Sequence, residues 1–116
     1  MKFTDTIKKN HEFRRLYAKG KSAVNPYLAV YARHTHRPEN RIGLTVSTKL
    51  GCAVVRNRVR RRLRELYRLH ETEFRPGTDL VIVARGRAVG ADFRKLERAL
   101  LGACAKLELL RPKETP

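Results

Sequence analysis

Acidic residues, cysteine and tryptophan are scarce in this chain. Asp and Glu number 11 against 27 Lys and Arg, there are two cysteines, and tryptophan is absent. The formal net charge at pH 7 is therefore +16, and a domain with that imbalance repels itself unless it meets a polyanion. Most of the excess is arginine, whose planar guanidinium suits phosphate better than the point charge of lysine does. The composition thus favours nucleic acid as the partner.

The few acidic residues are scattered along the chain. None forms the closely spaced pattern, such as Asp-x-Asp at a strand end, that two-metal hydrolysis of a phosphodiester requires. His34 and His36 stand close together but have no third ligand nearby, so a solvated loop is the better interpretation of that pair. We therefore predict no catalytic residue and no metal ligand in the protein itself.

The chain also lacks the marks of an exported or membrane-bound protein. Cys52 and Cys104 lie far apart with no Cys-x-x-Cys pair, which supports neither a zinc knuckle nor a disulfide framework. No apolar run reaches the roughly 20 residues of a membrane span, and no hydrophobic signal segment follows Met1. The length of 116 residues fits one domain, so we expect a single domain over 1–116, in the cytoplasm and without a membrane partner.

The densest feature that is present is a run of seven arginines from Arg56 to Arg68. Apolar residues recur within it every three or four positions, as in an amphipathic helix. One predicted stripe holds Val55, Val59, Leu63, Leu66 and His70, and the opposite side holds Asn57, Arg60, Arg61, Arg64 and Arg68. We predict a helix from about Ala53 to about His70 that packs on one side. Its other side could be only a solvated face, but like charges one turn apart repel, and bound phosphates would relieve that repulsion.

Alternating and apolar segments predict the strands. Residues 27–33 and 41–47 alternate apolar and polar side chains, which indicates two strands, and a hairpin is the natural connection between them. The apolar run 80–84 indicates a strand covered on both faces, hence a central or parallel one.

Two more helices complete the predicted fold. Asn10 is a candidate cap for a first helix that Gly20 can end in a left-handed conformation, and Asp92 is a candidate cap for a last helix. The predicted order is αββαβα. We expect an α+β domain in which helices pack on one face of a small sheet.

The aromatic residues supply a second signal. Phe13 and Tyr17 are one turn apart on the first helix, and alternation places Tyr27, Tyr31 and Arg33 on one face of the strand 27–33. An open sheet face with aromatic rings and a basic rim can hold unpaired bases, with stacking worth about 1–3 kcal/mol per base. The alternative is that Phe13 belongs to the core and the tyrosines only cover the sheet.

The segment from Lys49 to Glu65 closely resembles the signature of the bacterial ribonuclease P protein subunit. In that signature a glycine and an Ala-Val pair lead into an Arg-Asn-Arg basic helix, as Gly51, Ala53-Val54 and Arg56-Asn57-Arg58 do here. The resemblance covers most of the chain. It implies an α/β sandwich with a left-handed βαβ crossover, although right-handed crossovers are the general rule.

The resemblance also implies a function. Such a protein assists a catalytic RNA that holds the Mg²⁺ ions and removes the 5′ leader of precursor tRNA. The implied activity is that of an endoribonuclease whose chemistry belongs to the RNA. We expect no protein partner to be required. The residues implied to bind the RNA subunit are Arg56, Asn57, Arg58, Arg60, Arg61, Arg62 and Arg64, to which the helix adds Arg68. The residues implied to line a cleft for the single-stranded leader are Phe13, Tyr17 and Tyr31, to which the strand face adds Tyr27 and Arg33.

Two other functions are compatible with a basic helix on a small sheet. A structural RNA-binding protein, such as a ribosome or assembly factor, would share the helix and sheet but need no leader cleft. A self-sufficient metal-dependent nuclease would have to cleave RNA without an RNA partner, and the scattered acidic residues argue against it.

Overall fold

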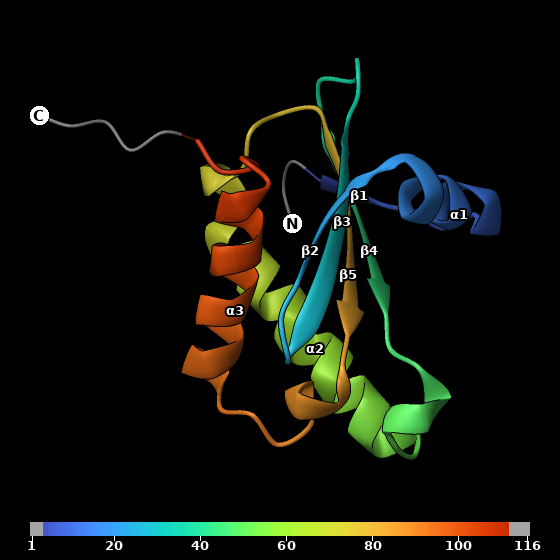
Figure 1. The fold of residues 1–116 in the computed structure, drawn as a ribbon, viewed down its shortest axis with the longest axis vertical. Helices are drawn as coiled ribbons and strands as arrows, with labels where there is room; N and C mark the ends of the chain where they lie inside the picture. The colour runs from blue at the N-terminus through green and yellow to red at the C-terminus, as the bar shows by residue number, and fades with distance from the viewer. Residues whose placement is uncertain (1–3, 112–116) are drawn as a thin grey trace, which may run out of the picture.

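The computed structural model describes residues 4–111, so the ends of the predicted domain 1–116 lie outside the described residues. Over these residues the chain forms a mixed α/β domain with three α-helices and a five-stranded sheet (Figure 1). The helices are α1 (Asn10–Lys19), α2 (Ala53–His70) and α3 (Phe93–Lys106). The strands are β1 (Thr4–Thr6), β2 (Lys21–Val24), β3 (Leu28–His34), β4 (Asn40–Thr45) and β5 (Thr78–Ala84).

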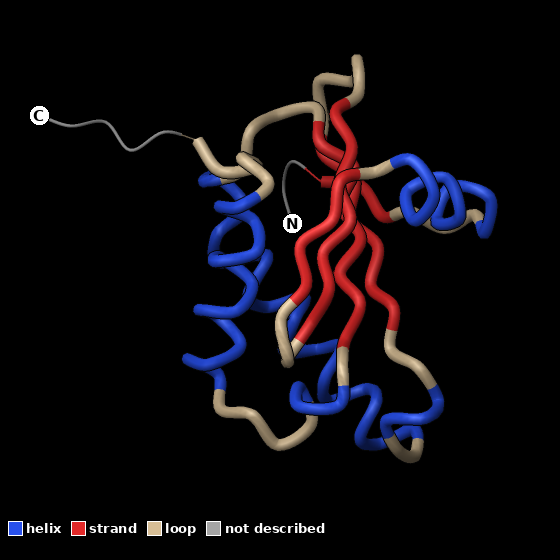
Figure 2. Tube along the Cα trace, in the orientation of Figure 1, coloured by secondary structure: helices blue, strands red, loops and turns tan. Residues whose placement is uncertain are grey.

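The α+β class and the order of the six predicted elements are confirmed. Figure 2 shows the two further strands, β1 and β2, which the sequence did not indicate. Both are short edge strands, and β1 consists of the three polar residues Thr4–Thr6. Neither carries the alternation of apolar and polar side chains by which a half-buried strand is recognised.

The strand order is β1-β4-β5-β3-β2, with β5 at the centre. The predicted hairpin between the strands 27–33 and 41–47 is therefore wrong, because β5 lies between β3 and β4. Six of the seven residues of β5 are buried, as its apolar sequence predicted. The strands β4 and β5 are parallel and α2 connects them in a left-handed crossover, which confirms the expectation drawn from the resemblance.

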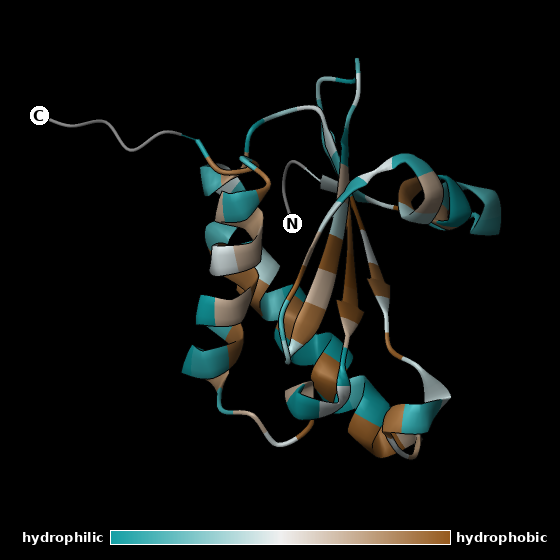
Figure 3. Ribbon diagram, viewed as in Figure 1, coloured by the Kyte–Doolittle hydropathy of each residue, from teal (hydrophilic) through white to brown (hydrophobic). Residues whose placement is uncertain are grey.

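Helices cover both faces of the sheet, and this corrects the prediction of a sheet packed on one face. Figure 1 shows α2 and α3 on one side and α1 on the other. The large core lies under α2 and α3, where Leu63, Leu96 and Ile82 are fully buried. Figure 3 shows that hydrophobic and hydrophilic positions alternate around these helices. A smaller cluster under α1 contains Ile7, Leu16 and Val81.

One of the two predicted helix caps, Asp92, is confirmed, and the other, Asn10, is wrong. The Asp92 carboxylate accepts a hydrogen bond from the backbone N–H of Lys95, so Asp92 caps α3 as predicted. Asn10 is instead the first residue of α1 and makes no capping bond, because Lys9 occupies the cap position. Gly20 is extended, with φ −75°, and not left-handed. A Cβ at Gly20 would lie 2.5 Å from the carbonyl oxygen of Leu16, so glycine is needed there for close approach.

Candidate nucleic-acid interface

The predicted basic helix forms with the bounds that the sequence indicated, Ala53–His70. Its buried side consists of Val59, Leu63, Leu66 and Tyr67. Three of these belong to the predicted apolar stripe, while Tyr67 was not foreseen. The opposite side is exposed and carries Asn57, Arg58, Arg61, Arg64 and Arg68.

Not all of the arginines of α2 face solvent in the same way. The Arg62 guanidinium donates to the backbone oxygen of Ala91 at 2.8 Å, and Arg56 Nε donates to the backbone oxygen of Gly51 at 3.2 Å. Both side chains are half-buried and hold the loops that flank α2 and α3. These two residues therefore have a structural task within the domain, which sequence periodicity could not reveal.

The remaining arginines of α2 differ in whether their side chains bond to other side chains of the protein. Arg68 pairs with Glu65 at 2.5 Å, and this hydrogen-bonded carboxylate raises the pKa of Arg68. Arg60 donates to Oδ1 of Asn57 at 3.3 Å. Within residues 4–111, the side chains of Arg58, Arg61 and Arg64 make no hydrogen bond or ion pair, so these three guanidiniums are free to meet phosphate groups.

Three aromatic rings form a cluster between α1 and the sheet. Phe13 and Tyr17 of α1 have ring centroids 6.5 Å apart, and Tyr17 meets Tyr31 of β3 edge to face at 5.0 Å. The hydroxyls of Tyr17 and Thr45 share a hydrogen bond of 2.9 Å. Tyr17 is 39 % exposed, while Phe13 and Tyr31 are half-buried. We call this cluster of Phe13, Tyr17 and Tyr31 the aromatic surface. Its rings are held in place by their contacts and are still accessible to solvent.

Gly43 of β4 gives the aromatic surface its flat floor. A Cβ at this position would lie 2.6 Å from the Phe13 ring, closer than side chains approach each other. Glycine therefore allows the ring to lie directly on the strand. Gly43 was not among the predicted site residues, although a glycine inside an apolar strand is a general signal of close approach by another group.

The aromatic surface and the basic helix meet at the edge of β4. Phe13, Arg60 and Arg64 line one hollow of about 140 Å³ together with apolar residues of β4. Segments far apart in the sequence, α1 and α2, thus supply a ring and two cations to the same place. A strand of nucleic acid that stacks on Phe13 would find positive charge immediately beside it.

An ion cluster anchors α1 to the sheet. Arg41 of β4 donates through Nε and Nη2 to the two carboxylate oxygens of Asp79, at 2.9 and 2.6 Å, and it also pairs with Glu12 of α1. These contacts, chiefly the hydrogen bonds to Asp79, hold the pKa of Arg41 above its ordinary value. Glu12 and Asp79 are therefore engaged in positioning the helix that carries Phe13 and Tyr17.

The structure does not bring Tyr27 to the aromatic surface. The side chain of Asn25 accepts hydrogen bonds from the backbone N–H groups of Tyr27 and Leu28, so the chain turns here and β3 starts only at Leu28. Tyr27 packs against the large core, on the opposite side of the sheet from Tyr31. The prediction that the two tyrosines share a face is wrong. Arg33 is exposed on β3 and lines a hollow with Arg15 of α1, and Phe13 is not among the residues that line that hollow.

The described residues, 4–111, contain no group of three His, Cys, Asp or Glu side chains that could hold a metal ion. Over the same residues, no helix is long and apolar enough to cross a membrane. Both cysteines are free: Cys104 is buried, which raises the pKa of its thiol to about 12, whereas Cys52 is exposed at the start of α2. Hydrogen bonds from the backbone N–H groups of Val55 and Val54 lower the pKa of Cys52.

The geometry defines a small α/β domain that presents a cationic helix beside fixed aromatic rings. A family model described as Ribonuclease P matches residues 1–108, and the chain belongs to that family. The Ribonuclease P protein component of Thermoanaerobacter sp. (strain X514) is 42 % identical over 108 residues, which is 93 % of each chain. The resemblance stated from the sequence is thereby confirmed.

Solved structures agree with this assignment. The RNase P protein of Staphylococcus aureus matches with a TM-score of 0.83 and 31 % identity, covering 91 % of this chain and 97 % of that one. The RNase P protein of Thermotoga maritima matches with a TM-score of 0.77 and 27 % identity, covering 84 % of this chain and 93 % of that one. The α/β fold described above is the fold of these proteins.

Proposed function

We propose that this chain acts as the protein subunit of ribonuclease P, in the cytoplasm, and assists removal of the 5′ leader from precursor tRNA. The exposed side of α2 binds the RNA subunit, and the aromatic surface holds the single-stranded leader. The partner RNA holds the Mg²⁺ ions and performs the phosphodiester hydrolysis. No further protein is needed for activity.

One observation carries this proposal. An aromatic ring, Phe13, lines one hollow together with the cationic residues Arg60 and Arg64. A protein that only coats structured RNA needs the cations but not the neighbouring half-exposed rings. The pairing therefore favours a protein that grips folded RNA and an unpaired strand at once.

The cations have a second consequence for the assembled enzyme. Guanidinium groups near the reacting strand screen its phosphates, so we expect the protein to lower the concentration of Mg²⁺ that the RNA requires. Binding should also weaken steeply with salt, with a log-log slope of about 0.7–0.9 for each phosphate neutralised.

Reconstitution tests the proposal. Purified protein, a bacterial ribonuclease P RNA and a labelled tRNA precursor are combined at low Mg²⁺, and correct leader removal should appear only when protein and RNA are both present. Cleavage by the protein alone would identify a self-sufficient nuclease. Selective recovery of ribosomal RNA from cell extract, with no stimulation of the ribonuclease RNA, would identify a structural RNA-binding protein.

Two variants separate the proposed roles. R58E/R61E reverses two side chains without internal partners, so it should weaken assembly with the RNA subunit and lower the salt slope by about 1.4–1.8, since two phosphate contacts are lost. Tyr31→Ala should instead weaken binding of a leader-containing precursor, with assembly retained. R87E/R94E, which changes two exposed arginines outside α2, is the matched charge control. Equal loss of both steps in all three variants would contradict this division.

A further inference from the structure

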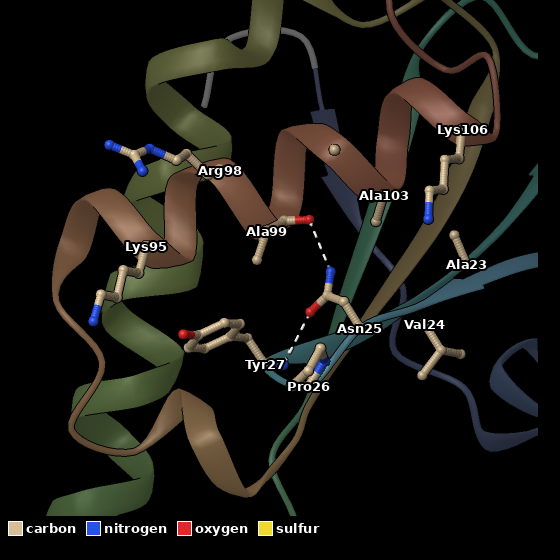
Figure 4. Close-up of a pocket in the computed structure, with 11 residues that line it drawn as sticks. Ala23, Val24, Asn25, Pro26, Tyr27, Lys95, Arg98, Ala99, Ala103 and Lys106 are labelled. Carbon is tan, nitrogen blue, oxygen red and sulfur yellow. Dashed lines mark hydrogen bonds between the residues drawn. The ribbon is translucent and has the colours of Figure 1, made fainter.

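A second cavity with cationic ends lies on the other side of the sheet from the aromatic surface. It is a groove of about 500 Å³ between α3 and the segment from β2 to the start of β3 (Figure 4). Its volume is in the range of ligand sites in proteins, about 300–1,000 Å³. The lining residues are Ala23, Val24, Asn25, Pro26, Tyr27, Lys95, Arg98, Ala99, Gly102, Ala103 and Lys106.

The groove combines an apolar floor, one aromatic ring and positive charge. Ala99 and Ala103 of α3 form part of the floor, and the half-buried Tyr27 ring lies below the helix (Figure 4). Lys95 stands near the Tyr27 end and Lys106 near the other end. The residues that line the groove include lysine and arginine but no acidic residue, so no lining carboxylate repels an anionic ligand.

The floor is held in place by hydrogen bonds of Asn25. Its side-chain amide donates to the backbone oxygen of Ala99 at 3.1 Å, and its Oδ1 accepts from the backbone N–H of Tyr27 at 2.9 Å. One residue thus ties the segment that carries the aromatic ring to the helix that carries the cations. The site is therefore formed before any ligand arrives, which lowers the ordering cost of binding.

We propose that this groove binds a short unpaired segment of RNA, separately from the aromatic surface. A base lies against the Tyr27 ring and the alanine floor, and flanking phosphates meet Lys95 and Lys106. These two lysines are separated by about 16 Å along the helix at 1.5 Å per residue. That separation exceeds the size of one phosphate group, so a strand with several phosphates fits better than a single nucleotide does.

The two sites draw on different parts of the molecule. Tyr27 packs against the large core, whereas Phe13 and Tyr31 pack against the small cluster under α1. No lining residue of the groove belongs to α1 or α2. The proposal goes beyond the function proposed above, and either one can fail while the other stands.

Gly102 offers a clean way to close the groove. It lies on the helix at the lining, and a Cβ at this position would meet nothing within 4 Å. The Cβ of Gly102→Leu therefore has open space at the lining, and we expect the rest of the leucine side chain to occupy part of the groove. Replacing glycine inside a helix favours the helix by up to about 1 kcal/mol. Gly102→Ala is the matched control, since it makes the same backbone change and leaves the groove open.

The test is an NMR titration of the full-length ¹⁵N-labelled protein with hexauridylate. The Ala99 amide reports the groove, and the Gly43 amide reports the aromatic surface. Hexauridylate should shift the Ala99 signal saturably. Gly102→Leu should weaken that response by at least about tenfold, the scale of one lost base stack, and should leave the Gly43 response unchanged. Gly102→Ala should bind as the unmodified protein does.

A charge variant and two competing ligands complete the test. For hexauridylate affinity measured from the Ala99 signal, K95E/K106E should lower the log-log slope of affinity against salt concentration by about 1.4, that is about 0.7 for each lost phosphate contact. The proposal would be overturned if hexauridylate did not shift the Ala99 signal. It would also be overturned if the Ala99 response were the same in Gly102→Leu and in K95E/K106E as in the unmodified protein. Equal affinity for uridine monophosphate, which would indicate a single-nucleotide site, or for hexaglutamate, which would indicate an acidic protein partner, would overturn it as well.

Discussion

The two faces of the sheet differ in how completely they are covered. Under α2 and α3, large side chains such as Leu63, Leu96 and Phe74 are at most 2 % exposed. Under α1, the buried cluster within residues 4–111 consists of Ile7, Leu16 and Val81, and the rings beside them remain partly open. One helix of ten residues is too short to seal a sheet face, so aromatic side chains on that face stay accessible.

This difference separates stability from binding in the molecule. Burial of apolar area contributes about 25 cal/mol per Å², so the more fully buried face dominates the stability. Rings that are held but not buried can exchange water for a base at little cost to the fold. We therefore expect substitutions under α2 and α3 to act mainly on unfolding, and substitutions at the aromatic surface to act mainly on binding.

The sharpest test compares one residue from each face. Leu63→Ala removes a fully buried side chain and should lower the free energy of unfolding by about 2–5 kcal/mol. Tyr17→Ala removes a ring that is 39 % exposed and one hydrogen bond, so it should cost only about 1 kcal/mol. Urea denaturation measures both. Equal losses would contradict the distinction between the faces.

The second test removes the ion cluster under α1. Arg41→Met leaves Glu12 and Asp79 mostly buried without their cation, and should cost about 3 kcal/mol. The triple variant R41M/E12Q/D79N removes the charges together, so it should recover part of the loss. Thermal unfolding of the three proteins measures this. An unchanged midpoint in R41M would mean that the cluster does not hold α1.

The third test changes the floor of the aromatic surface. Gly43→Ala places a methyl group within 2.6 Å of the Phe13 ring and forces the ring to move, at about 1–3 kcal/mol. Binding of a single-stranded leader should fall with it, while binding of the RNA subunit should not. Gly86→Ala, where a Cβ meets nothing within 4 Å, is the control. Unaltered leader binding would show that the position of the ring is unimportant.

The smallest effect concerns pH and the face under α2 and α3. Burial alone lowers the pKa of His70, but hydrogen bonds to Glu97 and Glu73 outweigh it and hold the pKa above the ordinary value. Protonated His70 therefore contributes stability that is complete below about pH 6.5 and lost as the pH rises through the raised pKa. We expect a loss of about 1 kcal/mol or less across that range. His70→Gln should not show it.

The helix α2 was predictable because its signal is long and repeated. Its apolar residues recur over five turns, so the period located Val59 and Leu63 on the buried side. The break in the pattern around Gly51 and the later Pro76 indicated the bounds near Ala53 and His70. The same period could not tell that Arg62 turns aside to bond the backbone of Ala91. That contact depends on where the loop before α3 lies, which no local pattern records.

The strand predictions failed where the chain changes direction. Alternation placed Tyr27 beside Tyr31, but the turn at Asn25 and Pro26 delays the start of β3 and sends Tyr27 to the other side. The hairpin prediction failed because β5, distant in sequence, has a more favourable place between β3 and β4 than at an edge, given its apolar side chains.

The sequence by itself determined the charge, the amphipathic helix and the family, because composition and period are properties of the chain alone. Only the tertiary structure decided that Phe13 lies against Gly43 and beside Arg60, and that Tyr27 joins Lys95 in a separate groove. These neighbours belong to segments that are far apart in sequence. Packing of the whole sheet and its helices determines which of them meet, and a pattern read over a few residues contains no information about that packing.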